Sequence, residues 1–86
     1  MQGVITSAQI RAARGLLKWT QATLAARGGT SIVTLNMIEN DSVTPRAGTL
    51  DGIRRALEAA GVEFLGEDGS GLGVRFRAKA ERRDRR

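Results

Sequence analysis

The pattern of apolar and polar positions is helical near the start of the chain. Thr6 and Gln9 are spaced as a capping box, and the apolar residues that follow predict a helix over about residues 7–18. Thr20 can cap a second helix, which ends at Gly28-Gly29 because glycine accepts the left-handed conformation of a helix stop. The apolar stripe of the first helix is Ile10, Ala13, Leu16 and Leu17.

Two more helices follow the glycine pair. Either Thr30 or Ser31 can cap a third helix, over about residues 31–40, which ends before the single proline, Pro45. A fourth helix stops at Gly61 and carries one apolar stripe for the core. That stripe is Leu50, Ile53, Leu57 and Ala60. These patterns therefore predict a mainly α fold of four to five helices.

Beyond the fourth helix the apolar period changes from helical to alternating. Residues 62–65 and 72–76 have the pattern of two short strands joined by a glycine-rich turn. A two-stranded hairpin is marginal alone, so it must pack on the helices or pair with the same segment of another subunit. The positions suited to such a dimer contact are Val62, Phe64, Val74 and Phe76. Residues 78–86 have no apolar period, which predicts a disordered basic tail.

Composition argues against several classes of function. The 86 residues are enough for one modest core, and they include neither cysteine nor histidine. Since the usual zinc ligands and nucleophile pairs are missing, we expect no enzyme, no metal and no cofactor. No apolar run approaches the roughly 18 residues that cross a bilayer, and the N-terminus lacks the order of a signal peptide. These features predict a cytoplasmic protein with no membrane partner.

The net charge of +5 is unevenly distributed along the chain. Residues 1–48 contain five basic and two acidic side chains, residues 49–73 two basic and five acidic, and residues 74–86 seven basic and two acidic. Basic ends around an acidic middle suit a protein that lays one surface on a polyanion, although basic tails also serve as solubilising ends. The acidic side chains of the fourth helix should then face away from a phosphate backbone.

The second and third helices, joined by a glycine turn, have the order of a helix-turn-helix motif. Over about residues 8–60 the sequence resembles the XRE family of helix-turn-helix proteins, which includes the Cro and repressor proteins of lambda-like phages. The positions that carry the resemblance are Gln21, Leu24, Ala25, Gly29, Ser31, Thr34, Leu35, Ile38, Glu39, Pro45, Thr49 and Leu50. It implies a lambda-repressor-like domain over residues 1–61, with the motif at about 20–40, followed by a small β-hairpin or strand pair at 62–77.

The resemblance also implies roles for individual residues. Arg14 and Glu39 fall where family members hold an ion pair between the first helix and the end of the third; the alternative is an exposed arginine and an ordinary helix end. Gln21 falls where the family places a side chain that touches a phosphate and braces the recognition helix; the alternative is a solvated first-turn residue. The implied core is Leu17, Leu24, Ala25, Leu35, Ile38, Leu50, Ile53 and Leu57.

The third helix holds more apolar residues than one buried face needs. At about 100° per residue, Leu35 and Ile38 cluster on the inward side, so the surplus faces outward. On a DNA reader, Asn36 can bond adenine bidentately, and the apolar side chains of Ile32, Val33 or Met37 can contact thymine methyl groups. The predicted DNA contacts are Gln21, Arg27, Thr30, Ser31, Ile32, Val33, Asn36, Met37, Asn40 and Arg46.

Two functions of different classes remain open. The first is a sequence-specific DNA-binding transcription regulator, a homodimeric repressor that reads the major groove of double-stranded DNA with the third helix. The second is a protein-interaction module on the same fold, such as an anti-activator or an antitoxin component. It is favoured by the outward apolar face, because exposed contiguous apolar area usually marks an interaction site.

Overall fold

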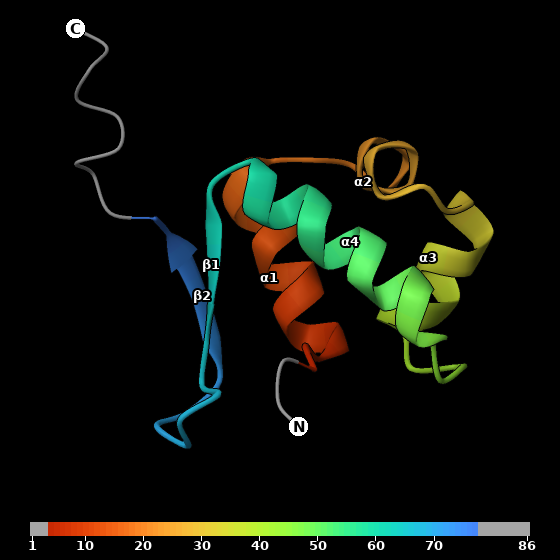
Figure 1. Ribbon diagram of the computed structural model, residues 1–86. Coiled ribbons are helices and arrows are strands. Elements are labelled where there is room, and N and C mark those ends of the chain that lie inside the picture. The colour runs from red at the N-terminus through yellow and green to blue at the C-terminus, as the bar shows by residue number, and fades with distance from the viewer. Residues whose placement is uncertain (1–3, 78–86) are drawn as a thin grey trace, which may run out of the picture.

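The computed structural model describes residues 4–77, which form four helices followed by a two-stranded antiparallel sheet (Figure 1). The predicted mainly helical fold with a C-terminal strand pair is confirmed, and the two strands pair within one chain. The basic tail at residues 78–86 lies outside the described residues. The elements are α1 (Ser7–Leu17), α2 (Gln21–Gly28), α3 (Ile32–Glu39), α4 (Ala47–Ala59), β1 (Val62–Leu65) and β2 (Gly73–Phe76).

The first three helices begin at side chains that cap them. Thr6 accepts a hydrogen bond from the backbone N–H of Gln9, and the Gln9 side chain accepts one from the backbone N–H of Thr6, so the capping box is complete. Thr20 caps α2 and Ser31 caps α3, each by accepting from the backbone N–H three residues on. Because Ser31 is the cap, α3 begins one residue later than the sequence pattern predicts.

The core is formed by all four helices, by Ile5 just before α1 and by the first residue of β1. Val62 is fully buried in the same apolar cluster as the helical residues, so the hairpin shares one core with the helices. Leu17 and Leu50 are only partly buried and pack against the edge of this cluster. The buried apolar residues are Ile5, Ile10, Ala13, Leu24, Ala25, Leu35, Ile38, Ile53, Leu57 and Val62.

Helices α2 and α4 approach each other closely at two glycines. A Cβ atom added to Gly52 would lie 2.6 Å from the carbonyl oxygen of Gly28, and one added to Gly28 would lie 3.3 Å from the Cα of Ile53. Both distances are shorter than an ordinary van der Waals contact. The absence of side chains at this crossing therefore sets how near the first helix of the motif lies to α4.

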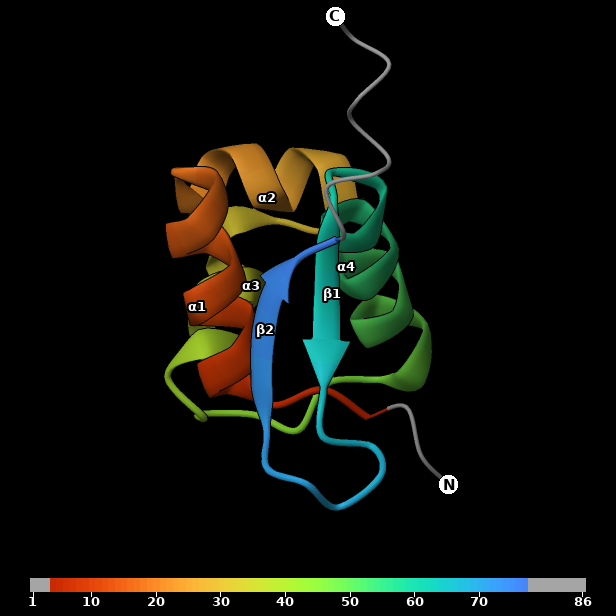
Figure 2. The ribbon, with the colours of Figure 1, turned by 90° about the vertical axis from the view of Figure 1, so that its left-hand side faces the viewer.

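The hairpin covers α1 and α4 on the side away from α3 (Figures 1 and 2). Phe64 lies opposite Val74 in the register, and on the neighbouring pair the Arg75 Nε is 3.0 Å from Glu63 Oε1. Gln9 joins the hairpin to α1, because its Nε2 donates to the carbonyl oxygens of Leu65, at 3.1 Å, and Gly73, at 2.9 Å. These two carbonyl oxygens, at the turn end of the hairpin, thus receive hydrogen bonds from one buried side-chain amide.

The four positions considered for a dimer contact differ in exposure. Val62 is enclosed in the core and cannot meet a second subunit while the protomer is folded. Phe64 and Val74 are half-buried against the helices, and the side chain of Arg54 lies over the ring of Phe64. Phe76 is 45% exposed, which leaves it as the one of these four with a largely free apolar side chain.

Candidate nucleic-acid interface

Helices α2 and α3 are joined by a tight turn at Gly29. This glycine has a φ of 76°, in the left-handed region, and the backbone N–H of Thr30 bonds the carbonyl oxygen of Ala25 at 3.0 Å. Ser31 then caps α3, and its hydroxyl also lies 2.9 Å from the hydroxyl of Thr34. The turn and the cap fix the direction in which α3 leaves α2.

The far end of α3 is held by a buried carboxylate. Glu39 accepts two hydrogen bonds from the guanidinium of Arg14, with Nε to Oε2 at 2.8 Å and Nη2 to Oε1 at 2.9 Å. Gln21, the first residue of α2, donates to the same carboxylate at 3.0 Å. Arg11 donates to the main-chain oxygen of Glu39. We call these four residues the Glu39 cluster; it ties α3 to both α1 and α2.

The carboxylate at the centre of the Glu39 cluster is almost fully buried and is paired with a cation. The side chain of Glu39 is 4% exposed and that of Arg14 is 23% exposed. Burial on its own raises the pKa of Glu39, but the hydrogen bonds from Arg14 and Gln21, with the charges of the two arginines, outweigh it and hold that pKa below its ordinary value. The hydrogen bond to Glu39 likewise raises the pKa of Arg14. Both groups are therefore ionised at neutral pH.

The outer face of α3 lies outside the Glu39 cluster, and on it Asn36 Oδ1 accepts a long hydrogen bond from Asn40 Nδ2, at 3.5 Å. Ile32 is 46% exposed and Val33 is 63% exposed, while Leu35 and Ile38 on the opposite side are buried. The exposed surface continues to the next turn with Asn36. This surface, formed by Ile32, Val33 and Asn36, is called the α3 outer face below. It lies at the end of the molecule opposite the hairpin (Figure 1).

Two of the residues predicted to share this face are less available. Met37 is half-buried, and the chain turns back after α3, where the backbone N–H of Ser42 bonds the carbonyl oxygen of Met37 at 2.9 Å. Asn40 is exposed, but its side-chain oxygen accepts hydrogen bonds from the backbone N–H and the hydroxyl of Ser42. Asp41, which lies between Asn40 and Ser42, has a φ of 63°, in the left-handed region. The last turn of α3 is thus hydrogen-bonded to the loop that follows it.

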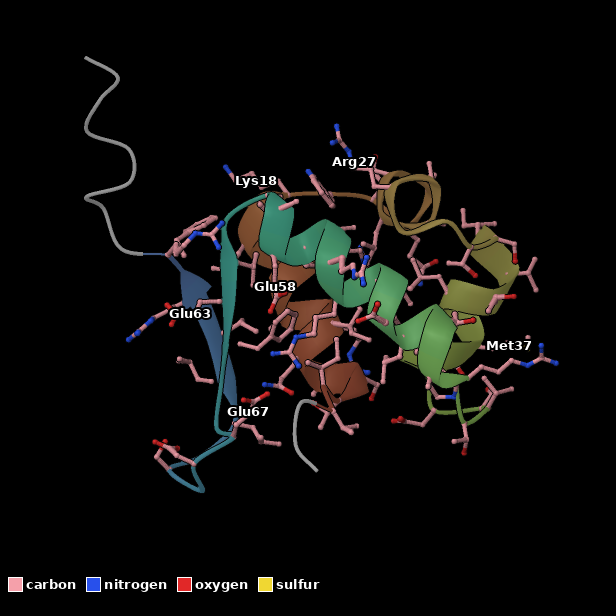
Figure 3. The ribbon with its side chains drawn as sticks, in the orientation of Figure 1. Lys18, Arg27, Met37, Glu58, Glu63 and Glu67 are labelled. Carbon is pink, nitrogen blue, oxygen red and sulfur yellow. The ribbon has the colours of Figure 1, made fainter. Side chains whose placement is uncertain are left out.

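Cationic side chains lie beside the motif. The guanidinium of Arg27 is 4.9 Å from the ring centre of Trp19, so the aromatic ring orients this exposed cation. Arg46 is exposed at the start of α4, where its side chain makes no capping bond. Figure 3 shows Arg27 on the α2 edge and Met37 on the α3 side, with Glu63 and Glu67 on the side of the hairpin.

The acidic middle of the chain is largely neutralised within the fold. Arg54 pairs with Glu58, at 2.9 Å, and with Glu67, at 3.3 Å. The other pairs are Arg55 with Asp51, at 2.9 Å, and Arg75 with Glu63, at 3.0 Å. Four carboxylates that would otherwise repel a polyanion are each paired with an arginine, and Glu58, Glu63 and Glu67 lie away from α3 in Figure 3.

The sequence pattern did not predict two residues of this region, nor the long-range contacts of a third residue, Gln9. Arg11 stands one helical turn before Arg14 and was not expected to reach α3. Trp19 supplies the ring under Arg27, and its carbonyl oxygen accepts from Arg14 Nη1 at 3.1 Å. A lone tryptophan next to the motif was the available signal. Gln9 was recognised as part of a capping box, but its bonds to the hairpin join residues 56 and 64 positions apart, which no local pattern reveals.

A short helix, a glycine turn and a second helix braced at its far end define a helix-turn-helix domain. A family model described as Helix-turn-helix matches residues 10–64, more than half of the sequence. The chain therefore belongs to the XRE family of helix-turn-helix proteins, a family of DNA-binding regulators, and the resemblance noted in the sequence is confirmed. The search of curated proteins found no match. No helix within residues 4–77 has the length and apolar character needed to span a bilayer.

Proposed function

We propose that this protein is a sequence-specific transcription regulator that reads the major groove of DNA with α3 and acts as a repressor. The observation that carries the proposal is the contrast between the two sides of α3. Its inner side and far end are fixed by Leu35, Ile38 and the Glu39 cluster, while the α3 outer face is exposed. A rigid helix with one free face is what reading of base edges needs, since the contact depends on direction.

Contacts to the phosphate backbone are proposed for the cations around the motif. Arg27 and Arg46 are exposed, and neither carries an ion pair among the salt bridges of residues 4–77. Gln21 stands at the N-terminus of α2, where backbone N–H groups favour an anion, although its amide already donates to Glu39. These groups would set the position of the protein on the duplex, and the α3 outer face would supply the sequence preference.

We also propose that the regulator binds as a homodimer. An eight-residue helix is about 12 Å long, which offers too few base contacts for useful specificity by itself. Two copies would read half-sites about 34 Å apart on one face of the duplex. The exposed ring of Phe76 and the open edges of the two-stranded sheet support the hairpin as the dimer contact. Repression would follow from occupying promoter DNA.

The first experiment is selection from sheared genomic DNA. The purified protein is incubated with the fragments and excess competitor at near-physiological salt, and the retained DNA is sequenced. We expect a short inverted repeat. Asn36→Ala should then reduce the preference for the selected site over a scrambled one, whereas Arg27→Ala should weaken binding to both about equally. Identical behaviour of the two variants on both duplexes would contradict the proposed roles.

One observation favours the alternative function, a protein-interaction module. Two β-branched apolar side chains, Ile32 and Val33, are exposed side by side at the start of α3. If they bind another protein, Val33→Lys should abolish the complex with that protein, and DNA binding should be weak and uniformly salt-sensitive. A salt-resistant complex with one specific duplex would eliminate this alternative.

A further inference from the structure

The first turn of α3 presents methyl groups, whereas side chains that contact base edges in the major groove commonly carry hydrogen-bonding groups. Val33 is 63% exposed and Ile32 is 46% exposed, and neither side chain has a donor or an acceptor. Leu35 and Ile38 already supply the apolar contacts that α3 makes with the core. The two exposed side chains are therefore not needed for packing, and they leave a hydrophobic surface at the end of the helix that leads into the groove.

The largest apolar group on the base edges of the major groove is a methyl group. It is the C5-methyl group of a pyrimidine, which thymine carries and cytosine acquires when methylated. Apart from small C–H edges such as C5–H of cytosine, the other base groups there are donors or acceptors, and burying a donor or acceptor against a valine would cost free energy because its bonds to water are lost. A valine at this position therefore favours a C5-methyl group over the C5–H of unmethylated cytosine.

The position of Val33 in the helix makes the contact directional. A β-branched side chain in a helix is nearly confined to one χ1 rotamer, so the methyl groups of Val33 point in a fixed direction. The capping bonds of Ser31 with Thr34 on the same turn fix the backbone around it. Asn36 is three residues on, a rise of about 4.5 Å along the helix, which exceeds the roughly 3.4 Å between stacked base pairs and so allows the two side chains to meet different base pairs.

Resting on the proposed DNA-reading function, we infer that Val33, with Ile32 beside it, recognises the C5-methyl group of a pyrimidine and that Asn36 reads an adenine in the adjoining base pair. Met37 is excluded from this contact by its half-buried position and by the bonding of its turn to the loop. The half-site then contains a thymine next to an adenine. At that position 5-methylcytosine should be bound more tightly than unmethylated cytosine.

The test removes one methyl group at a time from the DNA. In a duplex carrying the selected site, each thymine of one half-site is replaced by deoxyuridine, which keeps every hydrogen-bonding group. Dissociation constants are measured at fixed salt for the wild type, for Val33→Ala and for Val4→Ala. Val4 is the matched control because it is a valine with 67% exposure outside α3. At one thymine we expect deoxyuridine to weaken binding of the wild type and of Val4→Ala about fourfold.

The protein variant identifies which side chain makes the contact. Val33→Ala should bind the thymine and deoxyuridine duplexes equally, because the partner of the methyl group is gone. Circular dichroism checks its fold, which an exposed position should not disturb. A second pair of duplexes carries cytosine or 5-methylcytosine at the sensitive position. We expect tighter binding to the methylated member, and equal binding would refute recognition of the methyl group on cytosine.

Two negative results separate this inference from the function on which it rests. If the selected site is bound specifically but no thymine is sensitive to deoxyuridine, methyl recognition is refuted and the DNA-reading function stands. The same holds if Val33→Ala discriminates as well as the wild type. If no duplex is retained in the selection, the proposed function fails and the inference falls with it.

Discussion

Two buried polar side chains fasten different parts of this fold to α1, one with a charge and one without. Glu39 holds α3 through Arg14 and Gln21, and Gln9 holds the hairpin through two main-chain oxygens. Within residues 4–77 they are the two buried polar or charged residues, and no buried side-chain nitrogen or oxygen is left without a partner.

The difference between the two anchors lies in how each one can fail. The carboxylate of Glu39 is 4% exposed and needs its arginine, because an unpaired buried charge is far more costly than an unpaired amide. Gln9 is neutral, so its hydrogen bonds do not depend on pH. Its loss leaves the backbone N–H of Thr6 and the carbonyl oxygens of Leu65 and Gly73 without these bonds. The α3 end, which we propose reads DNA, is thus held more strongly than the hairpin end. Its anchor, however, depends on the paired arginine and on pH.

The largest expected effect comes from leaving Glu39 without its cation. Arg14→Met should lower the free energy of unfolding at pH 7 by about 3–5 kcal/mol, since the carboxylate stays buried with no ion-pair partner and keeps only the amide of Gln21 as a side-chain donor. Glu39→Gln should cost less, because Arg14 is 23% exposed and can reach water. Urea denaturation of both single variants and the double variant gives the coupling energy. A coupling energy near zero would mean that the pair does not act as a unit.

Acid should weaken the same anchor without any mutation. The folded-state pKa of Glu39 lies below its ordinary value of 4.5, so the stabilisation is complete above about pH 4.5 and is lost as the pH falls through the lowered pKa. Denaturation midpoints measured from pH 6 downward should fall less steeply in Glu39→Gln than in the wild type. A Gln9 variant should keep the wild-type slope, and equal slopes in all three proteins would refute the assignment.

Removing the neutral anchor should have a smaller and pH-independent effect. Gln9→Leu leaves the carbonyl oxygens of Leu65 and Gly73 without their donor and breaks the capping box at Thr6. We expect a loss of about 2–3 kcal/mol in the free energy of unfolding. Amide hydrogen exchange should show the loss of protection concentrated in β1 and β2, and a uniform loss over all elements would contradict a local anchor.

The smallest effects should come from two helical glycines with opposite surroundings. Gly52→Ala places a Cβ atom 2.6 Å from the Gly28 carbonyl oxygen and should destabilise the fold by about 1–3 kcal/mol. Gly15→Ala is the matched control, since a Cβ atom there meets nothing within 4 Å, and it should stabilise α1 by about 1 kcal/mol. Thermal unfolding that moves in the same direction for both variants would show that contact at the α2–α4 crossing is not what matters.

Local signals accounted for most of the fold. Capping residues such as Thr20 and the glycine stop at Gly29 act within four residues, so the sequence pattern alone places the helix ends closely. The change of period after α4 likewise predicted the strands. The close contact of Gly28 with α4 was not predictable, because a glycine at a helix end has a sufficient local explanation and the crossing partner is distant in sequence.

The candidate site was predicted less completely. A rotation of about 100° per residue correctly separates the buried Leu35 from the exposed Val33, since both lie in the regular part of α3. It says less about the last turn, where Met37 is half-buried and the exposed Asn40 bonds the loop, because helical periodicity carries no information on how the chain continues. The Arg14 and Glu39 pair came from the family resemblance and not from spacing, as the two residues lie on different helices.

The bonds of Gln9 also bear on how the chain is made. Its partners in the hairpin follow it by 56 and 64 residues, so a ribosome completes all four helices before those partners emerge. We expect the helices to collapse first, with the space that Val62 fills still open to water, and the hairpin to close the structure once it has emerged. Released chains that end at Gly61 should therefore be digested by protease faster than chains that include the hairpin.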